Sequence, residues 1–185
     1  MKRYTDERTK NTAGELWVCE HPPVFTLGQA GRQEHIHNVG NIPIVQSDRG
    51  GQVTYHGPGQ IVIYTLIDLR RRRLGIRDMV MLLENAVIDV LKTQDVSAKA
   101  RRDAPGVYVN GAKIAALGLR VRKGCTYHGL ALNVDNDLTP YAGIDPCGYQ
   151  GLEVTSMKQL GCSRAKDTVA RDLVEALRHQ LGELT

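Results

Sequence analysis

A cysteine held between a proline and a glycine is the strongest candidate for chemistry in this sequence. Cys147 stands in the stretch Asp145-Pro146-Cys147-Gly148, within a long irregular segment, 133–151. Long loops in compact domains commonly carry function, and a rigid, approachable turn suits a nucleophile better than a core residue. The pattern favours Cys147 as a nucleophile, and a structural role is the alternative that stays open.

The other cysteines fit packing roles. Cys19 lies within an expected strand, Cys125 begins another, and Cys162 lies in a loop before the last expected helix. No CxxC pair occurs, so we expect free thiols. His35 and His37 are two residues apart, but no third ligand is evident nearby, and we predict no metal site.

A lysine enters an apolar run directly after the strongest hairpin signal in the chain. Asn110-Gly111 joins 106–109 to 112–121, and Lys113 is the first charged residue after this turn. A lysine is costly to bury unless its ammonium has a partner or a task. Lys113 is therefore a candidate functional group, while an exposed lysine at the hairpin edge stays open.

A glycine-rich stretch, DRGGQVTYHGPGQ at 48–60, reads as a short strand between glycine loops. Such a strand would deliver Arg49 and His56 toward a shared space. Two tight hairpin turns with ordinary polar groups are the alternative. His128, beside Gly129, invites a catalytic interpretation, but a histidine on a strand is more often a hydrogen-bonded residue of the core or its rim.

The elements that must position these residues form an α+β pattern. We expect a mixed or antiparallel sheet packed by helices, because several strands precede or surround two amphipathic helices rather than alternate with them. The expected strands are 15–20, 24–27, 60–69, 96–99, 106–109, 112–121 and 126–134, the last interrupted at Gly129. The expected helices are 78–94, with Asp78 as N-cap, and 167–181.

The length of 185 residues and the net charge of +4 indicate one domain, 1–185, with a modest excess of basic groups. No apolar run is long enough to span a membrane and no signal peptide is evident, so we expect a cytoplasmic protein. Four consecutive arginines, Arg70 to Arg73, suggest either a solvated turn or a docking patch for an acidic partner.

Four separated motifs occur in one order: RGGQVTYHGPGQ at 49–60, APGVYVNGAKIAALGLRVRKG at 104–124, HGLALNV at 128–134 and DPCGYQGLEVTSM at 145–157. Together they resemble the lipoyl(octanoyl) transferase family, from about residue 15 onward. This family is similar in fold to the catalytic domains of biotin and lipoate ligases. The resemblance implies transfer of an octanoyl or lipoyl group from acyl carrier protein to a lysine of lipoyl domains, the first step of endogenous protein lipoylation.

By this resemblance Cys147 accepts the acyl group as a thioester and Lys113 activates it, since a nearby ammonium stabilises a thiolate. Exchange between thioesters needs no ATP, so no cofactor and no metal are expected. The acceptors would be lipoyl domains of 2-oxoacid dehydrogenases and the glycine cleavage H protein, with no nucleic acid or membrane as partner. The implied substrate contacts are Arg49, Gly50, Gly51, Gln52, Val53, Thr54, Tyr55, His56, Ala116, Leu117, Gly118, Gly129, Leu130 and Ala131.

Acidic partners would find candidate docking residues in Arg70 to Arg73, and also in Arg120, Arg122 and Lys123. One departure from the family pattern concerns the start of the chain. Family members usually carry a further strand before the point that corresponds to Met1, and without it we expect an exposed sheet edge that could promote association.

Two rival functions stay open at this level. An ATP-dependent lipoate ligase shares the fold but would not require Cys147 as a nucleophile. A non-enzymatic binder of nucleic acid or acidic proteins would use the arginine run, although few aromatic residues interleave with it. Retention on DNA compared with retention on an acyl carrier protein column would discriminate the binder.

Overall fold

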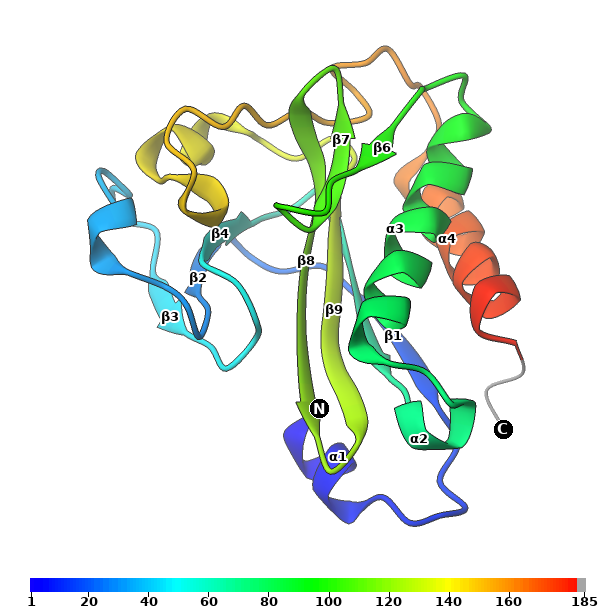
Figure 1. The fold of residues 1–185 in the computed structure, drawn as a ribbon. Helices are drawn as coiled ribbons and strands as arrows, with labels where there is room; N and C mark the ends of the chain where they lie inside the picture. The colour runs from blue at the N-terminus through cyan, green and yellow to red at the C-terminus, as the bar shows by residue number, and fades with distance from the viewer. Residues whose placement is uncertain (183–185) are drawn as a thin grey trace.

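A six-stranded antiparallel sheet forms the centre of the computed structural model, which describes residues 1–182 (Figure 1). The expected α+β class is confirmed. In spatial order the strands are β1 (Glu15–Cys19), β5 (Gln60–Leu66), β9 (Cys125–Asn133), β8 (Ala112–Arg122), β7 (Gly106–Val109) and β6 (Lys99–Ala100). The strand from Gln60 is buried along nearly its whole length because β1 and β9 flank it on both sides.

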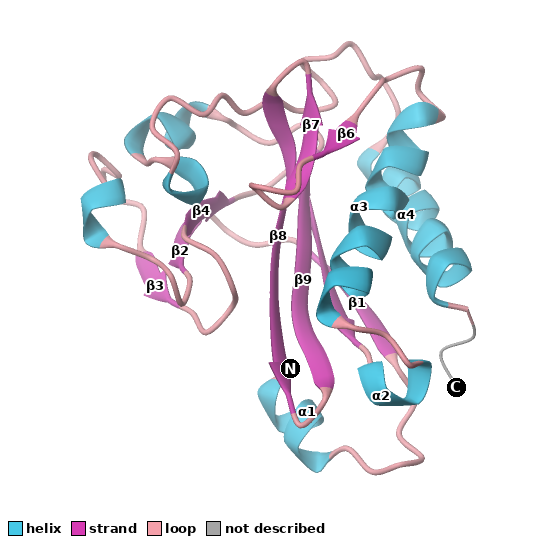
Figure 2. Cartoon of the chain, in the orientation of Figure 1, coloured by secondary structure: helices cyan, strands magenta, loops and turns pink. Residues whose placement is uncertain are grey.

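Two helices, α3 (Ile76–Lys92) and α4 (Lys166–Leu181), cover one face of this sheet (Figures 1 and 2). Apolar residues at helical spacing on each helix, such as Leu83 and Val87 on α3 and Leu173 and Leu177 on α4, join the main hydrophobic core. None of the helices within residues 1–182 combines the length and apolar character that a membrane span requires.

A smaller three-stranded sheet lies on the other side of the long hairpin β8–β9 (Figure 1). It contains β3 (Ile44–Gln46), β2 (Val24–Leu27) and β4 (Val53–His56), with β2 parallel to β3 and antiparallel to β4. Phe25 and Tyr55 pack with Tyr141 in a separate small core. The short helical elements are α1 (Lys2–Glu7), η1 (Gln33–His35), α2 (Leu69–Arg72), η2 (Thr139–Gly143) and η3 (Pro146–Gly148).

Several local expectations need correction. The strand expected at 126–134 is not interrupted, because Gly129 pairs with both Tyr64 and Gly118 inside β9. Asp78 is not the N-cap of α3: Gly75 takes that position, and the Asp78 carboxylate accepts a hydrogen bond from the Gly75 N–H at 2.8 Å.

Two other boundaries also differ. The strand from Gln60 ends at Leu66, and the first three arginines of the run lie in α2, whose N-cap Asp68 accepts hydrogen bonds from Arg70 and Arg71 N–H. The strand expected at 96–99 is reduced to β6. The hairpin at Asn110-Gly111 is present, with positive φ at both residues (50° and 90°).

Candidate functional site

Lys113 contacts Cys147 directly. Its Nζ lies 2.7 Å from Sγ of Cys147 and 3.2 Å from the carbonyl oxygen of Pro105. The Lys113 side chain is buried, with 3% of its surface exposed, and its Nζ lies 5.2 Å from the ring centroid of Tyr108. The sequence alone showed no partner for this ammonium. In the structure it has three partners: the sulfur of Cys147, the Pro105 carbonyl and the Tyr108 ring.

The hairpin β7–β8 and a glycine make room for this lysine. Gly106 has φ +146°, and a Cβ at that position would lie 2.7 Å from Cε of Lys113. The N–H of Gly106 donates to the buried carboxylate of Glu84 at 2.9 Å. Burial raises the pKa of Glu84. Gly106, Tyr108 and Glu84 were not predicted as site residues. The glycine in the motif APGVYVNG, Gly106, was the one sequence feature that could have pointed to them.

Cys147 lies in the strained middle of η3. Its φ and ψ are 58° and 17°, a left-handed conformation that costs a non-glycine residue about 1–3 kcal/mol. The turn is closed by a hydrogen bond of 2.9 Å from Gly148 N–H to the carbonyl of Asp145. Surrounding contacts must hold this conformation, and they centre on Asp145.

Two histidines clamp the carboxylate of Asp145. His37 Nε2 lies 3.0 Å from Oδ1 and His35 Nδ1 lies 3.3 Å from Oδ2, while Asp145 N–H donates to the carbonyl of His35 at 2.9 Å. The hydrogen bond with His37, followed by the one with His35, lowers the pKa of Asp145. The paired histidines thus anchor the turn that carries Cys147, a role that their spacing alone did not reveal.

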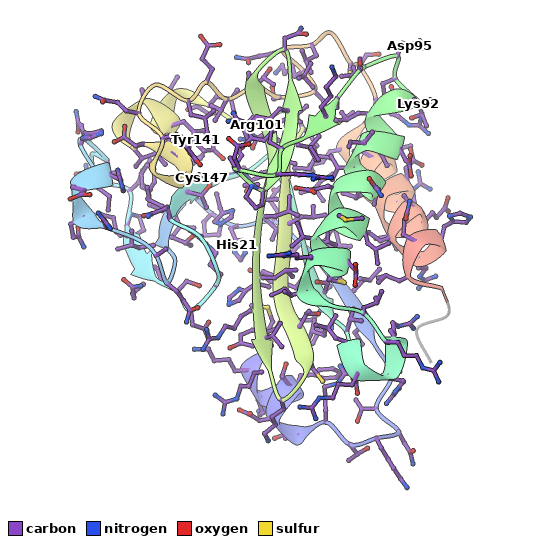
Figure 3. All side chains as sticks on the ribbon, viewed as in Figure 1. His21, Lys92, Asp95, Arg101, Tyr141 and Cys147 are labelled. Carbon is purple, nitrogen blue, oxygen red and sulfur yellow. The ribbon has the colours of Figure 1, made fainter. Side chains whose placement is uncertain are left out.

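An apolar cavity of about 130 Å³ begins at Cys147 and lies between the small sheet and strands β5, β8 and β9. Engineered apolar cavities of about 150 Å³ hold a benzene-sized ligand, so this volume suits a hydrocarbon group. Figure 3 labels Cys147, Tyr141 and His21 on the side of β8 where the small sheet lies. The predicted contacts that line the cavity are Arg49, Gly51, Gln52, Val53, Thr54, His56, Ala116, Leu117, Gly118, Gly129, Leu130 and Ala131.

Two of the predicted contacts lie elsewhere. Tyr55 is buried in the small core, because its ring packs between Phe25 and Tyr141. Gly50 lines a second cavity that also reaches Cys147, and its N–H donates to the carbonyl of Leu119 at 3.0 Å. Conversely, His21, Thr26, Tyr64 and His128 line the first cavity and were not predicted as contacts.

Facing glycines keep the floor of the first cavity flat. Gly118 on β8 pairs with Gly129 on β9. A Cβ on Gly129 would lie 2.0 Å from the carbonyl oxygen of Ile63, and one on Gly118 would lie 2.9 Å from that of Gly50. Any side chain at these positions would displace a neighbouring backbone, so the glycines are required by close approach.

Arg49 holds the glycine-rich loop to the small sheet. Its guanidinium donates to Thr26 Oγ1 at 2.9 Å, to the Thr26 carbonyl at 2.5 Å and to the Gly50 carbonyl at 2.9 Å. Burial lowers the pKa of Arg49 to about 10, so the side chain stays cationic at neutral pH. It therefore supplies a fixed positive charge in the cavity wall.

Three histidines in the cavity wall are kept neutral. Burial lowers the pKa of His56 to about 4, and it also lowers the pKa of His21 and of His128. His21 Nε2 lies 2.6 Å from the Tyr64 hydroxyl, and His128 Nε2 lies 2.9 Å from Oδ1 of Asp48. The contact with Asp48 supports a structural interpretation of His128 rather than a catalytic one.

The sequence is similar to known proteins of one family. The lipoyl protein ligase A/B catalytic domain family matches residues 1–178. A curated octanoyltransferase from Shewanella piezotolerans is 55% identical over 98% of this chain and 83% of its own length. Octanoyltransferases from Vibrio vulnificus (57%; 98% and 84%) and Xanthomonas campestris (58%; 98% and 78%) are similarly close.

Solved structures share the fold at low identity. A lipoate-protein ligase A bound with ATP superposes with a TM-score of 0.80 at 16% identity, over 97% of this chain and 77% of that one. A biotin protein ligase from Aquifex aeolicus gives a TM-score of 0.59 at 14% identity, over 84% and 69%. The expected similarity to biotin and lipoate ligase domains is confirmed.

Proposed function

The chain belongs to the lipoyl protein ligase A/B catalytic domain family and, within it, to the octanoyltransferases, which are acyltransferases of protein lipoylation, and we propose that its transfer passes through a thioester on Cys147. The observation that carries this proposal is the 2.7 Å contact between Lys113 Nζ and Cys147 Sγ at the mouth of an apolar cavity. A cysteine paired with a buried ammonium is poised as a thiolate nucleophile.

In the first half-reaction the Cys147 thiolate attacks the carbonyl carbon of an octanoyl thioester carried by acyl carrier protein. The bond between this carbon and the donor sulfur breaks, and the departing thiolate takes a proton from the Lys113 ammonium. The products are a free donor thiol, octanoyl-Cys147 and a neutral Lys113. One thioester replaces another, so the step requires no ATP.

In the second half-reaction the neutral ε-amine of an acceptor lysine attacks octanoyl-Cys147. The carbon–sulfur bond breaks, an amide forms, and the proton lost by the amine passes to Lys113. This restores the pair of ammonium and thiolate, so the enzyme returns to its starting state. Formation of an amide from a thioester is downhill and drives the transfer.

The cavity supplies selectivity for the acyl group. Each methylene that leaves water for an apolar wall contributes about 0.8 kcal/mol. Lining residues such as Leu117, Leu130 and Ala131 offer such walls, while Gly118 and Gly129 leave the chain a path along the sheet. An octanoyl chain therefore binds several kcal/mol more tightly than a very short acyl group.

We propose acyl carrier protein as the donor, and lipoyl domains of 2-oxoacid dehydrogenases and the glycine cleavage H protein as acceptors; the cytoplasmic location stays a prediction. Two features of the run Arg70 to Arg73 limit its role as a docking patch: its distance from the site and its contacts within the fold. It lies beside the β8–β9 turn, nine residues along β8 from Lys113, or about 30 Å. Some of its charge also serves the fold, because Arg71 donates to the Lys10 carbonyl and Arg72 to the Leu181 carbonyl.

The test is the intact mass of the protein after incubation with octanoyl-acyl carrier protein in the absence of ATP. We expect a gain of one octanoyl group that hydroxylamine removes, and no gain in Cys147→Ser. No adduct on the unchanged chain, with a donor shown to be competent, would refute the acyl-enzyme. Octanoylation of a lipoyl domain that required ATP would favour the ligase instead.

A further inference from the structure

A second cavity also reaches Cys147. Its volume is about 300 Å³, and it shares Gly51, Gln52, Leu117 and Gly118 with the first cavity. Cys147 lines both spaces, so they meet at this residue. We refer to the second one as the edge groove, lined in addition by Gly50, Ile76, Val80, Asp103, Ala104, Pro105, Leu119 and Tyr149.

The edge groove exists because β7 is shorter than β8. Strand β7 pairs with β8 only as far as Ala116, so Leu117 to Leu119 form a free edge that the glycine loop approaches through the hydrogen bond from Gly50 to Leu119. The first turns of α3 and the loop at 103–105 form the opposite walls. The groove leads along this free edge to the nucleophile.

Its walls expose apolar surface that the fold itself does not use. Ile76, the first residue of α3, is 49% exposed, and Tyr149 is 42% exposed. The Tyr149 hydroxyl donates to the Asp103 carbonyl at 3.0 Å, which joins the loop at 103–105 to the segment after Cys147. Exposed apolar residues that converge on a reactive sulfur are the signature of a substrate path.

The charge of the groove indicates which kind of substrate side chain fits it. Its lining residues include one carboxylate, Asp103, which is paired with the guanidinium of Arg101, and they include no lysine and no arginine, so the walls carry no uncompensated charge. An unbranched aliphatic side chain that ends in an amine fits these walls. Walls without uncompensated charge favour the neutral amine that attack requires.

We propose that the edge groove admits the side chain of the acceptor lysine to octanoyl-Cys147. The inference rests on the proposed function, since it takes the acyl chain to occupy the first cavity. With that cavity filled, the thioester carbonyl at Cys147 is open to attack from the edge groove. The amine then arrives beside Lys113, which takes its proton.

The test separates the two half-reactions and narrows the groove. Ile76→Trp and Val80→Trp add bulk at its wall, and Met81→Trp is the matched control, because Met81 is a neighbouring α3 residue that is 56% exposed and does not line the groove. Each protein is first acylated with an octanoyl ester of a short thiol, such as N-acetylcysteamine. The isolated octanoyl-enzyme is then mixed with a lipoyl domain, and loss of the adduct is followed by mass.

For the groove variants we expect transfer to the lipoyl domain to slow by about tenfold or more. Acylation by the short thioester should stay within about twofold of the control. Transfer at the control rate would overturn the assignment, and a slowed reaction with carrier-bound donor alone would assign the groove to the donor's arm instead. Equal slowing of both half-reactions would also overturn it, since the wall would then merely support Cys147.

Failure of the proposed function looks different. It appears before any groove variant is made, as absence of the octanoyl adduct on the unchanged chain, and it would remove the premise of the groove's assignment as well.

Discussion

Lys113 and Cys147, which are 34 residues apart in the sequence, meet with Nζ and Sγ 2.7 Å apart. The contact joins a hairpin strand to a long loop. It depends on the segment after the nucleophile, because Lys113 N–H donates to the Glu153 carbonyl and Thr155 N–H donates to the Lys113 carbonyl. The chemistry of the site is therefore set by loop placement as much as by residue type.

Replacing Lys113 by glutamine keeps most of the shape and removes the charge. We expect acylation of Cys147 to slow by about 10²- to 10⁴-fold, the range for loss of a positioned proton donor. Alkylation of Cys147 by iodoacetamide at pH 7 should slow too, because the thiolate loses its counter-ion. Quenched time courses analysed by intact-protein mass give the rates of acylation and of alkylation. Lys92→Gln, at an exposed lysine, is the control. Unchanged alkylation in Lys113→Gln would contradict the activating role.

Chain-length selectivity should respond to Ala131→Leu. Ala131 is 5% exposed and lines the acyl cavity between Val62 and Ala116. The added carbons take the room of about three methylenes, worth about 2 kcal/mol of octanoyl binding. Competition between hexanoyl and octanoyl thioesters should shift at least about tenfold toward hexanoyl. The same change at the exposed Ala100 should leave the ratio unaltered, and a shift there as large as at Ala131 would argue against this cavity as the acyl site.

The clamp on Asp145 should matter for rate more than for stability. In Asp145→Asn the two imidazoles lose their charged acceptor, so the turn with positive φ at Cys147 is held less firmly. We expect kcat for acylation to fall by about tenfold or more, with KM for the donor unchanged. Asp135→Asn, at an exposed aspartate, is the control. A fall in Tm without loss of kcat would show that the clamp only stabilises the fold.

His56 should make the fold sensitive to mild acid. Its folded pKa is about 4 because of burial, against 6.5 for an unperturbed histidine. The unfolded chain therefore takes up a proton that the folded chain refuses. The stability that the neutral His56 contributes to the folded chain is complete above pH 6.5 and is lost as the pH falls toward 4. His21 and His128, whose pKa values burial also lowers, act with the same sign.

For His56 the free energy of unfolding should fall by about 2 kcal/mol between pH 7 and pH 5. Urea unfolding at these two pH values measures it, and His56→Gln should lose less stability over the interval than the unchanged chain. Equal losses in both proteins would show that His56 is not the group responsible.

The distance of the arginine run from Cys147 predicts an effect on encounter alone. Arg70→Gln combined with Arg73→Gln removes two exposed charges and leaves Arg72 in place. The rate with a short octanoyl thioester should not change. KM for carrier-bound donor should rise and its dependence on salt should weaken. If both stay as in the unchanged chain, the run has no part in docking.

The sequence predicted those features that depend on local chemistry. Asn110-Gly111 predicted the hairpin because both residues adopt positive φ readily, and the periodicity of α3 and α4 predicted their buried faces. Lys113 stood out because a charged residue at the start of an apolar strand needs a partner. Cys147 stood out because of the proline and glycine beside it.

Features that depend on long-range contact were beyond reach. Gly129 suggested an interruption, but its missing side chain lets Ile63 approach, which only the pairing of β5 with β9 reveals. The spacing of His35 and His37 gave no role to the pair once a metal site was judged absent, whereas their common contact is a carboxylate about a hundred residues later in the chain, Asp145. The edge groove likewise follows from the relative lengths of β7 and β8.

The double anchoring of the loop at 145–155 has a consequence for redox chemistry. One end is tied to His35 and His37 through Asp145, and the other is tied to the backbone of Lys113 through Glu153 and Thr155. If this loop opens, Cys147 leaves its ammonium at the same moment as it enters solvent. A solvent-exposed thiol without that partner reacts slowly with peroxide. The Cys147 thiol is therefore reactive only while the loop at 145–155 is ordered. Oxidative damage to Cys147 should concentrate on the enzyme that has this loop closed and carries no acyl group.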